Sequence, residues 1–144
     1  MYGSHLVKHW ATTQKTLALS SGEAELQGIV KGASEALGLQ SLAEDLGAKI
    51  VVHIRTDLSA AIGICNRTGI GKVRHLATGQ LWVQDKIRNK VIRLFKHPGT
   101  ENPGDICTKH VTNETIQKHL PQVQINYQEG RASCAPTLTE KRGK

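Results

Sequence analysis

The stretch TLALSSGEAELQGIVKGASEALGLQSLAEDLG, residues 16–47, decides the fold. It predicts a short apolar strand, a break at Ser-Ser-Gly, and then a long helix with Glu23 and Glu25 in its first turn. Ser20 and Glu23 have the spacing of a capping box, and Gly47 is a suitable helix end. The helix is amphipathic, because its apolar residues recur at helical spacing at Leu26, Ile29, Val30, Ala33 and Leu37.

Apolar segments around this stretch predict a sheet. Residues 5–10 have the composition of an edge strand, and they turn at residues 11–15 into the strand at 16–20, which gives a hairpin. Residues 50–56 are apolar at nearly consecutive positions, as expected of a strand that is covered on both faces. A further strand is predicted over residues 91–97. We therefore expect a mixed sheet.

Helices are predicted between and after these strands. Residues 58–65 form a short apolar helix, and a second helix extends from about residue 76 to about residue 88. Asn102 suits the cap of a further helix, and Pro103 suits its first position. The order of strands and helices predicts an α/β layered fold, in which a mixed sheet is flanked by helices.

The length of 144 residues fits one small domain. We assign this domain to residues 1–111, because the apolar pattern weakens beyond them. Residues 112–144 form a C-terminal extension, which we expect to be largely disordered from about residue 121. Polar residues, glycine and proline dominate that tail, so it has little apolar surface to bury.

Charge and cysteine content narrow the classes of function. A formal net charge of +7 and an isoelectric point near 9.5 favour a polyanionic partner, nucleic acid ahead of an anionic membrane, with an ordinary basic surface as the alternative. The three cysteines are widely spaced and form no Cys-x-x-Cys pair, which suggests neither a disulfide framework nor a zinc site. No apolar run approaches the ~20 residues of a membrane span, and the N-terminus does not resemble a signal peptide. We expect a soluble intracellular protein, cytoplasmic or nuclear, that is not secreted and has no membrane partner.

Three carboxylates occupy points where predicted strands end or predicted helices begin, namely Glu25, Asp57 and Asp105. In open α/β sheets such points meet at one edge of the sheet. Two Mg²⁺ ions about 4 Å apart can hydrolyse a phosphodiester, and their ligands are a cluster of Asp and Glu oxygens. Structural alternatives remain open: Glu23 can serve only as a cap partner, Asp57 can cap the next helix, and the dipole at a helix start favours Asp105.

Four blocks of sequence form a specific pattern. They are TLALSSGEAEL at residues 16–26, TDLSAAI at 56–62, KVRHL at 72–76 and NPGDICTKHV at 102–111. Together, over residues 3–111, they resemble the ribonuclease H domain of copia-type retrotransposon Pol polyproteins in both order and spacing. The resemblance implies a ribonuclease H-like mixed sheet flanked by helices and two-metal cleavage of RNA in an RNA–DNA hybrid. It implies two Mg²⁺ ions as cofactors and the reverse transcriptase part of the same polyprotein as a partner.

By this resemblance, Glu25, Asp57 and Asp105 are the catalytic and metal-binding residues. Glu25 is chosen over Glu23 because the run Glu-Leu-Gln-Gly-Ile that begins at Glu25 resembles the family's helix motif. The capping box gives Glu23 a separate role, although helical periodicity puts Glu23 nearer the buried stripe. Asp105 corresponds to the aspartate of the family's Asn-Pro-Ala-Asp motif, in which Gly104 here replaces alanine.

The sequence also departs from the family. Ala77 stands where the family's Lys-His-Ile-Asp block has an acid. The family carries a first catalytic aspartate on a central opening strand, and this sequence starts after that strand. We therefore expect a domain truncated at its N-terminus, with weak or no nuclease activity. The alternative is a non-catalytic, nucleic-acid-binding remnant of a retroelement polyprotein.

Basic residues dominate residues 67–96, where Asp85 is the one acid. We expect such a strip to contact phosphates, with a solvated helix face as the alternative. The low aromatic content favours a duplex or hybrid over unpaired bases. His97 loosely resembles the loop histidine of ribonucleases H, which implies an accessory role in product release or proton transfer. The candidate nucleic-acid-binding residues are Lys72, Arg74, His75, Lys86, Arg88 and Lys90.

Overall fold

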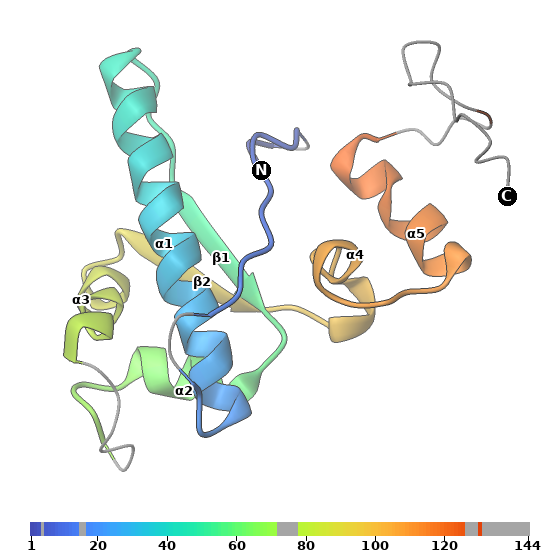
Figure 1. The fold of residues 1–144 in the computed structure, drawn as a ribbon. Helices are drawn as coiled ribbons and strands as arrows, with labels where there is room; N and C mark the ends of the chain where they lie inside the picture. Colours follow the sequence, from blue (N-terminus) through green and yellow to red (C-terminus); the bar gives the residue numbers. More distant parts are fainter. Residues whose placement is uncertain (4, 15–16, 72–77, 126–129, 131–144) are drawn as a thin grey trace, which may run out of the picture.

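The computed structural model describes residues 1–3, 5–14, 17–71, 78–125 and 130 (Figure 1). Its helices and strands follow in the order α1 (Ser21–Asp45), β1 (Val52–Thr56), α2 (Ser59–Asn66), α3 (Trp82–Arg88), β2 (Ile92–Lys96), α4 (Asp105–Thr108) and α5 (Asn113–His119). Short 3-10 helices lie at Thr78–Gln80, Gly99–Glu101 and Pro121–Val123.

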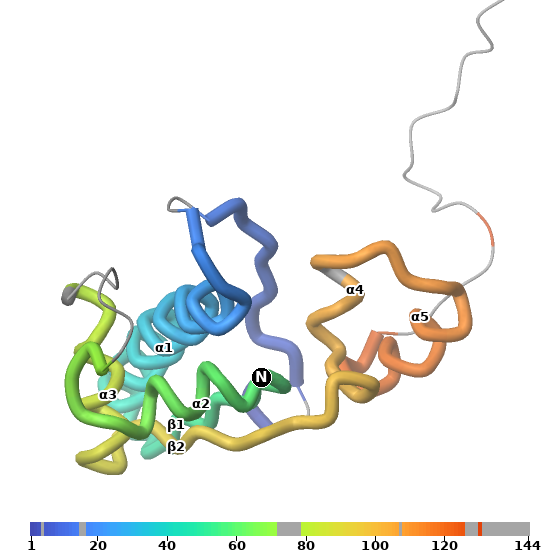
Figure 2. Tube along the Cα trace, turned by 90° about the horizontal axis from the view of Figure 1, so that it is seen from below, coloured from blue at the N-terminus to red at the C-terminus, as the bar shows by residue number. Residues whose placement is uncertain are grey.

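The two strands form a parallel sheet, in which Val52 is opposite Ile92 and Thr56 is opposite Lys96. Helices α2 and α3 supply the crossover that a parallel pair requires. Helices α4 and α5 lie to one side of this unit, beyond the carboxyl end of β2 (Figure 1 and Figure 2). The predicted α/β class is confirmed at this level, whereas the predicted mixed sheet is not found among the described residues, in which the two strands are parallel.

The core lies between one face of the sheet and the three helices α1, α2 and α3. Cys65 of α2 lies in this core, and its burial raises the pKa of the thiol to about 11, so this thiol is protonated at neutral pH. Gly22 of α1 lies against α2, since a Cβ atom there would be in van der Waals contact with the Cβ of Ala60, 3.4 Å away. The buried cluster consists of Leu26, Ile29, Ala33, Val52, Ala61, Ile64, Cys65, Val83 and Ile92.

The prediction that residues 50–56 would be covered on both faces is wrong. Val52 and Thr56 are buried, whereas His53 and Arg55, which alternate with them, are exposed. On β2, Phe95 is exposed on the same face as His53, and their rings meet edge to face with centroids 5.2 Å apart. The reason is visible in the sequence, because polar residues interrupt the apolar run at every second position of β1.

The predicted N-terminal hairpin is also wrong for the residues that the structure describes. Residues 5–14 and 17–20 contain no strand, and an isolated bridge joins Tyr2 to His5. The segment lies beside α1 instead, because the Gln14 side chain donates a hydrogen bond to the Ala24 carbonyl at 2.8 Å. A two-stranded hairpin without a neighbouring strand is marginal in water, and β1 does not supply one.

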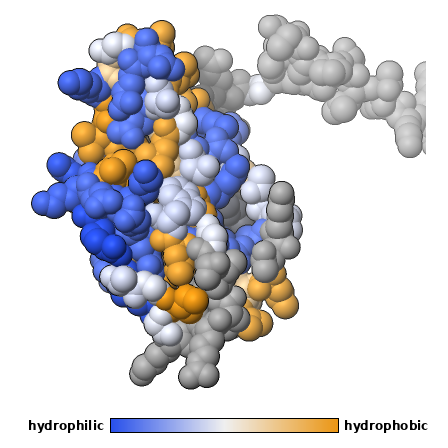
Figure 3. Space-filling model, turned by 90° about the vertical axis from the view of Figure 1, so that its left-hand side faces the viewer, coloured by the Kyte–Doolittle hydropathy of each residue, from blue (hydrophilic) through white to orange (hydrophobic). Residues whose placement is uncertain are grey.

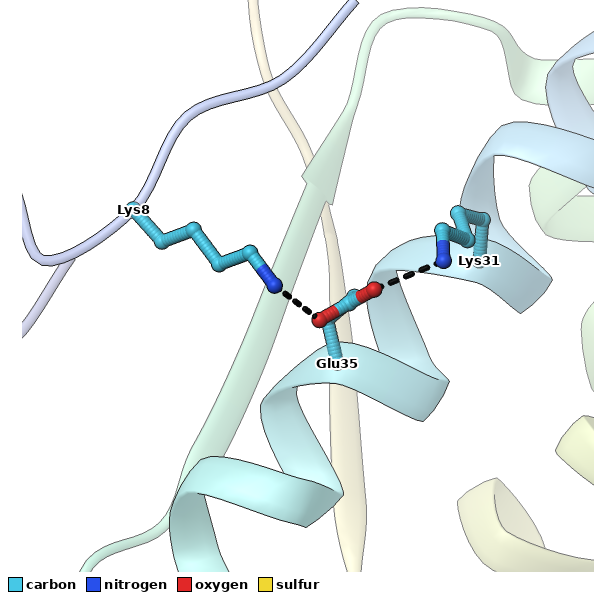
Figure 4. Close-up of polar contacts among 3 residues, drawn as sticks. All are labelled: Lys8, Lys31 and Glu35. Atoms are coloured by element: carbon cyan, nitrogen blue, oxygen red, sulfur yellow. Dashed lines mark hydrogen bonds and ion pairs between the residues drawn. The ribbon is translucent and has the colours of Figure 1, made fainter. Parts of the chain in front are cut away.

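An ion-pair triad fixes this N-terminal segment to α1 (Figure 4). Lys8 and Lys31 each lie 2.6 Å from one carboxylate oxygen of Glu35. Hydrogen bonds from Lys31 and then from Lys8 lower the pKa of Glu35 to about 2. The segment therefore lies beside the helix through charged contacts in place of strand pairing.

The ends of α1 follow the sequence. Ser20 caps the helix, since its hydroxyl accepts a hydrogen bond from the Glu23 N–H at 3.3 Å. The Glu23 carboxylate accepts one from the Leu19 N–H at 3.0 Å, so both members of the predicted capping box bind backbone donors. Gly47 has a φ of +78°, and the N–H groups of residues 47 and 48 bind the last carbonyls of the helix.

The later helices match their predictions in part. Residues 58–65 are helical as predicted, within α2. Only residues 82–88 of the helix predicted from 76 are in α3, and residues 72–77 lie outside the described residues. Asn102 accepts a hydrogen bond from the Gly104 N–H at 3.1 Å, although α4 begins only at Asp105.

The predicted C-terminal extension contains α5, whose His119 is buried. Most of the tail predicted to be disordered, residues 126–129 and 131–144, lies outside the described residues. Among the helices that the structure describes, none has the length and apolar character needed to cross a membrane.

Candidate functional site

The carboxyl end of β1 meets the beginning of α1 through a short hydrogen bond. The hydroxyl of Thr56, the last residue of β1, is buried and donates to the Glu25 carboxylate at 2.6 Å. This bond holds Glu25 at the end of β1, and Asp57 directly follows Thr56 in the chain. Helix α1 thus contacts the end of β1 through Glu25, at the residue before Asp57.

Asp57 also packs against the loop that follows β2. A Cβ atom added at Gly99 would lie 3.1 Å from Oδ2 of Asp57, so the backbone of the loop approaches this carboxylate closely. The loop begins directly after β2, whose last paired residue is opposite Thr56. The parallel register therefore brings this loop to the end of β1, where it limits the movement of the Asp57 side chain.

Asp105 and Lys109 complete the site from α4. Nζ of Lys109 lies 2.9 Å from Oδ1 of Asp105, one helical turn away. The hydrogen bond and charge of Asp105 raise the pKa of Lys109, and the negative charges of Asp57 and Glu25 raise it further. The Lys109 ammonium therefore lies in the combined field of all three predicted acids.

The three acids do not fit a metal ion in this arrangement. Within the described ranges of the chain, no group of three or more His, Cys, Asp or Glu side chains is positioned to hold one. The Asp105 carboxylate is neutralised by Lys109, and Glu25 accepts the Thr56 hydroxyl. The site thus concentrates negative charge and attracts cations, but its cation here is an ammonium group.

Glu23 and Glu25 have different environments, although they are two positions apart. Glu23 is buried, with 5% of its surface exposed, and its carboxylate binds the Leu19 N–H at the start of α1. Glu25 is half-buried and is turned to the end of β1 through Thr56. Of the two, Glu25 is the one that reaches the candidate site.

The predicted basic strip lies elsewhere. Lys86, Arg88 and Lys90 are in or directly after α3, which leads into the amino end of β2. The length of the sheet, roughly 15 Å at ~3.3 Å per residue, therefore separates them from Asp57. Arg88 also donates to the Thr68 hydroxyl at 3.2 Å. The other three predicted contacts, Lys72, Arg74 and His75, lie outside the described residues.

His97 lies next to the candidate site, directly after β2. Its backbone N–H donates to the Thr56 carbonyl at 2.8 Å, and its ring Nε2 is 3.0 Å from the Glu101 carbonyl. The His97 ring therefore bonds the loop after β2. Among the described residues, no hydrogen bond joins it to Glu25, Asp57 or Asp105.

Sequence reasoning missed two features of this region. The first is Lys109, which the i,i+4 spacing from Asp105 in a predicted helix could have indicated. The second is a cationic surface on the uncovered face of the sheet, where Arg55 and Arg93 are exposed on neighbouring strands. The alternation of polar residues along each strand was the signal for that surface.

Comparison of the chain with known protein families, with curated proteins and with solved structures finds no match.

Proposed function

We propose that the chain is a ribonuclease H-type domain of a copia-type retrotransposon polyprotein and that it acts on RNA–DNA hybrids. The observations that support this proposal are the hydrogen bond from Thr56, the residue before Asp57, to Glu25 and the ion pair of Asp105 with Lys109. Glu25, Asp57 and Asp105 are the acids to which the sequence resemblance assigns catalysis, and they come from α1, the end of β1 and α4. A hybrid would meet this acidic site at the carboxyl end of the sheet.

Hydrolysis by this chain is expected to be weak or absent. Bound Mg²⁺ supplies Lewis acidity and activates water in two-metal nucleases. Because Asp105 is paired with Lys109 and the described residues hold no ready cluster of metal ligands, the arrangement does not fit that ion. We therefore derive no hydrolytic step from it.

The same ion pair supports a second function, which is binding of nucleic acid without cleavage. Lys109, whose Nζ lies 2.9 Å from the Asp105 carboxylate, competes with a divalent ion for that acid. Binding of a hybrid needs no such ion, because phosphates are bound by exposed cations. The two functions therefore differ in their requirement for metal.

Cations for hybrid binding are available on two exposed parts of the surface. Arg55 and Arg93 lie on the uncovered sheet face, and Arg88 and Lys90 lie at the amino end of β2. The net charge of +7 favours association with a polyanion. The reverse transcriptase part of the same polyprotein is the proposed protein partner, because it produces the hybrid.

Binding and cleavage can be measured on one labelled RNA–DNA hybrid. We expect fluorescence anisotropy to show binding in both EDTA and Mg²⁺, with an affinity that falls as salt concentration rises. We expect cleavage in Mg²⁺ to be slow or undetectable. Absence of binding at low salt would overturn both proposed functions.

Two variants separate the two functions. Asp57→Asn removes a charge from the candidate site, and Asp85→Asn removes one from the exposed surface of α3 as the matched control. Cleavage that Asp57→Asn abolishes and Asp85→Asn preserves would support the nuclease. Binding without cleavage in all three proteins would support the second function and exclude the first for this chain.

A further inference from the structure

The uncovered face of the β1–β2 sheet carries two aromatic rings and two guanidinium groups. In the parallel register, His53 is opposite Arg93, and Arg55 is opposite Phe95. All four residues are exposed, because they alternate along the strands with the side chains that pack on the helices. Each ring thus has an arginine as its neighbour on the other strand. We refer to these four residues as the sheet-face patch.

The sequences of both strands favour exposure of this patch. Arg55 and Arg93 lie on the same face of neighbouring strands, and a covering layer of apolar side chains would bury two charges at a high cost in free energy. Neither strand contains an acid that could neutralise them. This face therefore suits an anionic partner, whatever other segments of the chain lie beside the sheet.

The two arginines of the patch have no acidic partner. Elsewhere in the chain, Lys31 and Lys109 each pair with a carboxylate one helical turn away. Across the ranges that the structure describes, no ion pair engages Arg55 or Arg93. Their guanidinium groups are therefore available to an external anion, and a guanidinium can bind a phosphate group through two parallel hydrogen bonds.

The rings of the patch suit the stacking of bases. Phe95 is the single phenylalanine of the chain, and it retains 44% of its accessible surface. Its ring meets that of His53 edge to face, with centroids 5.2 Å apart and an angle of 68° between the ring planes. Unpaired bases stack on aromatic side chains that a sheet presents in this way. The low aromatic content of the whole chain favours a duplex, but it does not show that this ring lies beside two unpaired arginines.

The cationic surface continues at the amino end of β2. Arg88 and Lys90 are in or directly after α3, and both are exposed. Figure 3 shows the side of the molecule that carries α3, where hydrophilic side chains cover much of the surface. A polyanion on the sheet-face patch can therefore extend toward α3, away from the acids at the carboxyl end of β1.

We propose that the sheet-face patch binds an unpaired stretch of nucleic acid. A base stacks on the Phe95 ring, which the His53 ring holds in place, and Arg55 and Arg93 bind phosphates. This inference rests on the proposed binding of nucleic acid, to which it adds a site and a preference for an unpaired strand. Because an unpaired template strand continues beyond the end of a growing hybrid, one chain can contact both.

The test uses the full chain in EDTA with two fluorescein-labelled probes, a ten-nucleotide oligothymidylate and an RNA–DNA hybrid of ten base pairs. By fluorescence anisotropy, we expect Phe95→Ala to weaken binding of the single strand at least fivefold, because the stacking platform is lost. Binding of the hybrid stays within twofold, since its bases are paired. Phe95→Tyr keeps a ring and should bind the single strand within twofold of the unsubstituted chain. Leu46→Ala, the matched control, removes another exposed apolar side chain and leaves binding of both probes unchanged.

A direct measurement of stacking does not depend on any variant. Because Phe95 is the single phenylalanine, selective labelling of that amino acid gives NMR signals from one ring. We expect the ring protons to shift upfield when oligothymidylate is added and to stay in place when an abasic oligonucleotide with the same number of phosphates is added. Ring signals that do not move while the single strand is bound would overturn the proposal even if a variant did not fold.

The arginines are tested through the salt dependence of binding. Arg55→Ala and Arg93→Ala should each reduce the slope of log affinity against log salt concentration by roughly 0.7, the value for one phosphate contact on a single strand. Lys118→Ala on α5 is the control and leaves the slope unchanged. Equal affinity for the abasic oligonucleotide, or binding of the hybrid without the single strand, would overturn this inference and leave the proposed function intact. Absence of binding to either probe would overturn both.

Discussion

The two faces of the β1–β2 sheet have opposite environments, although they belong to the same ten residues. On the covered face, Val52 and Ile92 are buried beneath α1, α2 and α3. On the other face, His53, Arg55 and Phe95 are exposed, and Phe95 retains 44% of its accessible surface. The folding free energy that this sheet contributes therefore comes from one face, and the other is available for binding.

This difference explains where the candidate functions lie. Residues that hold the fold together point to the helices, whereas the charged residues are at the strand ends or on the uncovered face. Asp57 follows the last residue of β1, and Arg55 precedes that residue by one position. Strand β1 thus has an acid directly after its end and a cation on its uncovered face.

The largest loss of stability is predicted for a substitution on the covered face. Ile92→Ala removes a fully buried side chain next to Val52 and Val83, and we expect a loss of about 2–5 kcal/mol in the free energy of unfolding. The matched control is Phe95→Ala on the uncovered face, where we expect about 1 kcal/mol or less. Urea denaturation followed by circular dichroism measures both. Equal losses would show that both faces are packed.

Substitution of a buried amide, that of Gln84, should give the next largest loss of stability. Gln84 is buried, and its side chain donates to the carbonyls of Ile64 at 2.8 Å and Gly69 at 3.0 Å while it accepts the Gly69 N–H at 2.9 Å. Gln84→Leu leaves these three groups without partners, so we expect a loss of about 1–3 kcal/mol. The exposed Gln117→Leu serves as the control. A loss no larger than that of the control would contradict the role of the amide.

Helix α1 and its ends could be predicted from the sequence because the signals are local. The capping residues Ser20 and Glu23, the apolar stripe and Gly47 all act within a few residues of the helix. The hairpin could not be predicted correctly, because a strand needs a partner whose presence the segment itself does not encode. The exposed face of residues 50–56 is different, because the polar His53 and Arg55 at alternate positions are a local signal that the prediction of a strand covered on both faces did not use.

The sequence proposes residues for the candidate site, but it does not predict their side-chain contacts. Glu25, Asp57 and Asp105 come from elements that the sequence identifies, and helix starts and strand ends meet in such folds. The Thr56 hydroxyl that holds Glu25, and the Lys109 ammonium that neutralises Asp105, act through side-chain geometry. Such geometry depends on the relative position of α1, β1 and α4, which no local pattern specifies.

Smaller changes in stability are expected for substitutions in the turns that lead from α1 to β1 and from α3 to β2. A residue of positive φ lies two positions after the end of each helix, Gly47 at +78° after α1 and Lys90 at +58° after α3. Because a side chain disfavours this conformation, Lys90→Gly should stabilise the chain by about 0.5–1 kcal/mol. Gly47→Ala should destabilise it by about 1 kcal/mol, since no other group approaches the added Cβ. Thermal unfolding measures both, and changes of the same sign would contradict the explanation.

The smallest predicted effect concerns the triad that holds the N-terminal segment to α1. Hydrogen bonds from Lys31 and Lys8 lower the pKa of Glu35 from 4.5 to about 2, so the charged form is favoured in the folded chain. The stabilisation is therefore complete above about pH 4.5 and is lost as the pH falls through about 2. Because these side chains are exposed, we expect little change in overall stability over that range.

Carbon-13 NMR titration of the Glu35 carboxyl group measures this contact. We expect a midpoint near 2 in the unsubstituted chain, a rise in the midpoint with Lys8→Ala, and a larger rise with Lys31→Ala, whose hydrogen bond is the larger cause of the shift. Lys118→Ala, a substitution on α5, is the control and should leave the midpoint unchanged. A midpoint near 4.5 in the unsubstituted chain would show that neither lysine is bonded to Glu35, so that this contact does not hold the N-terminal segment to α1.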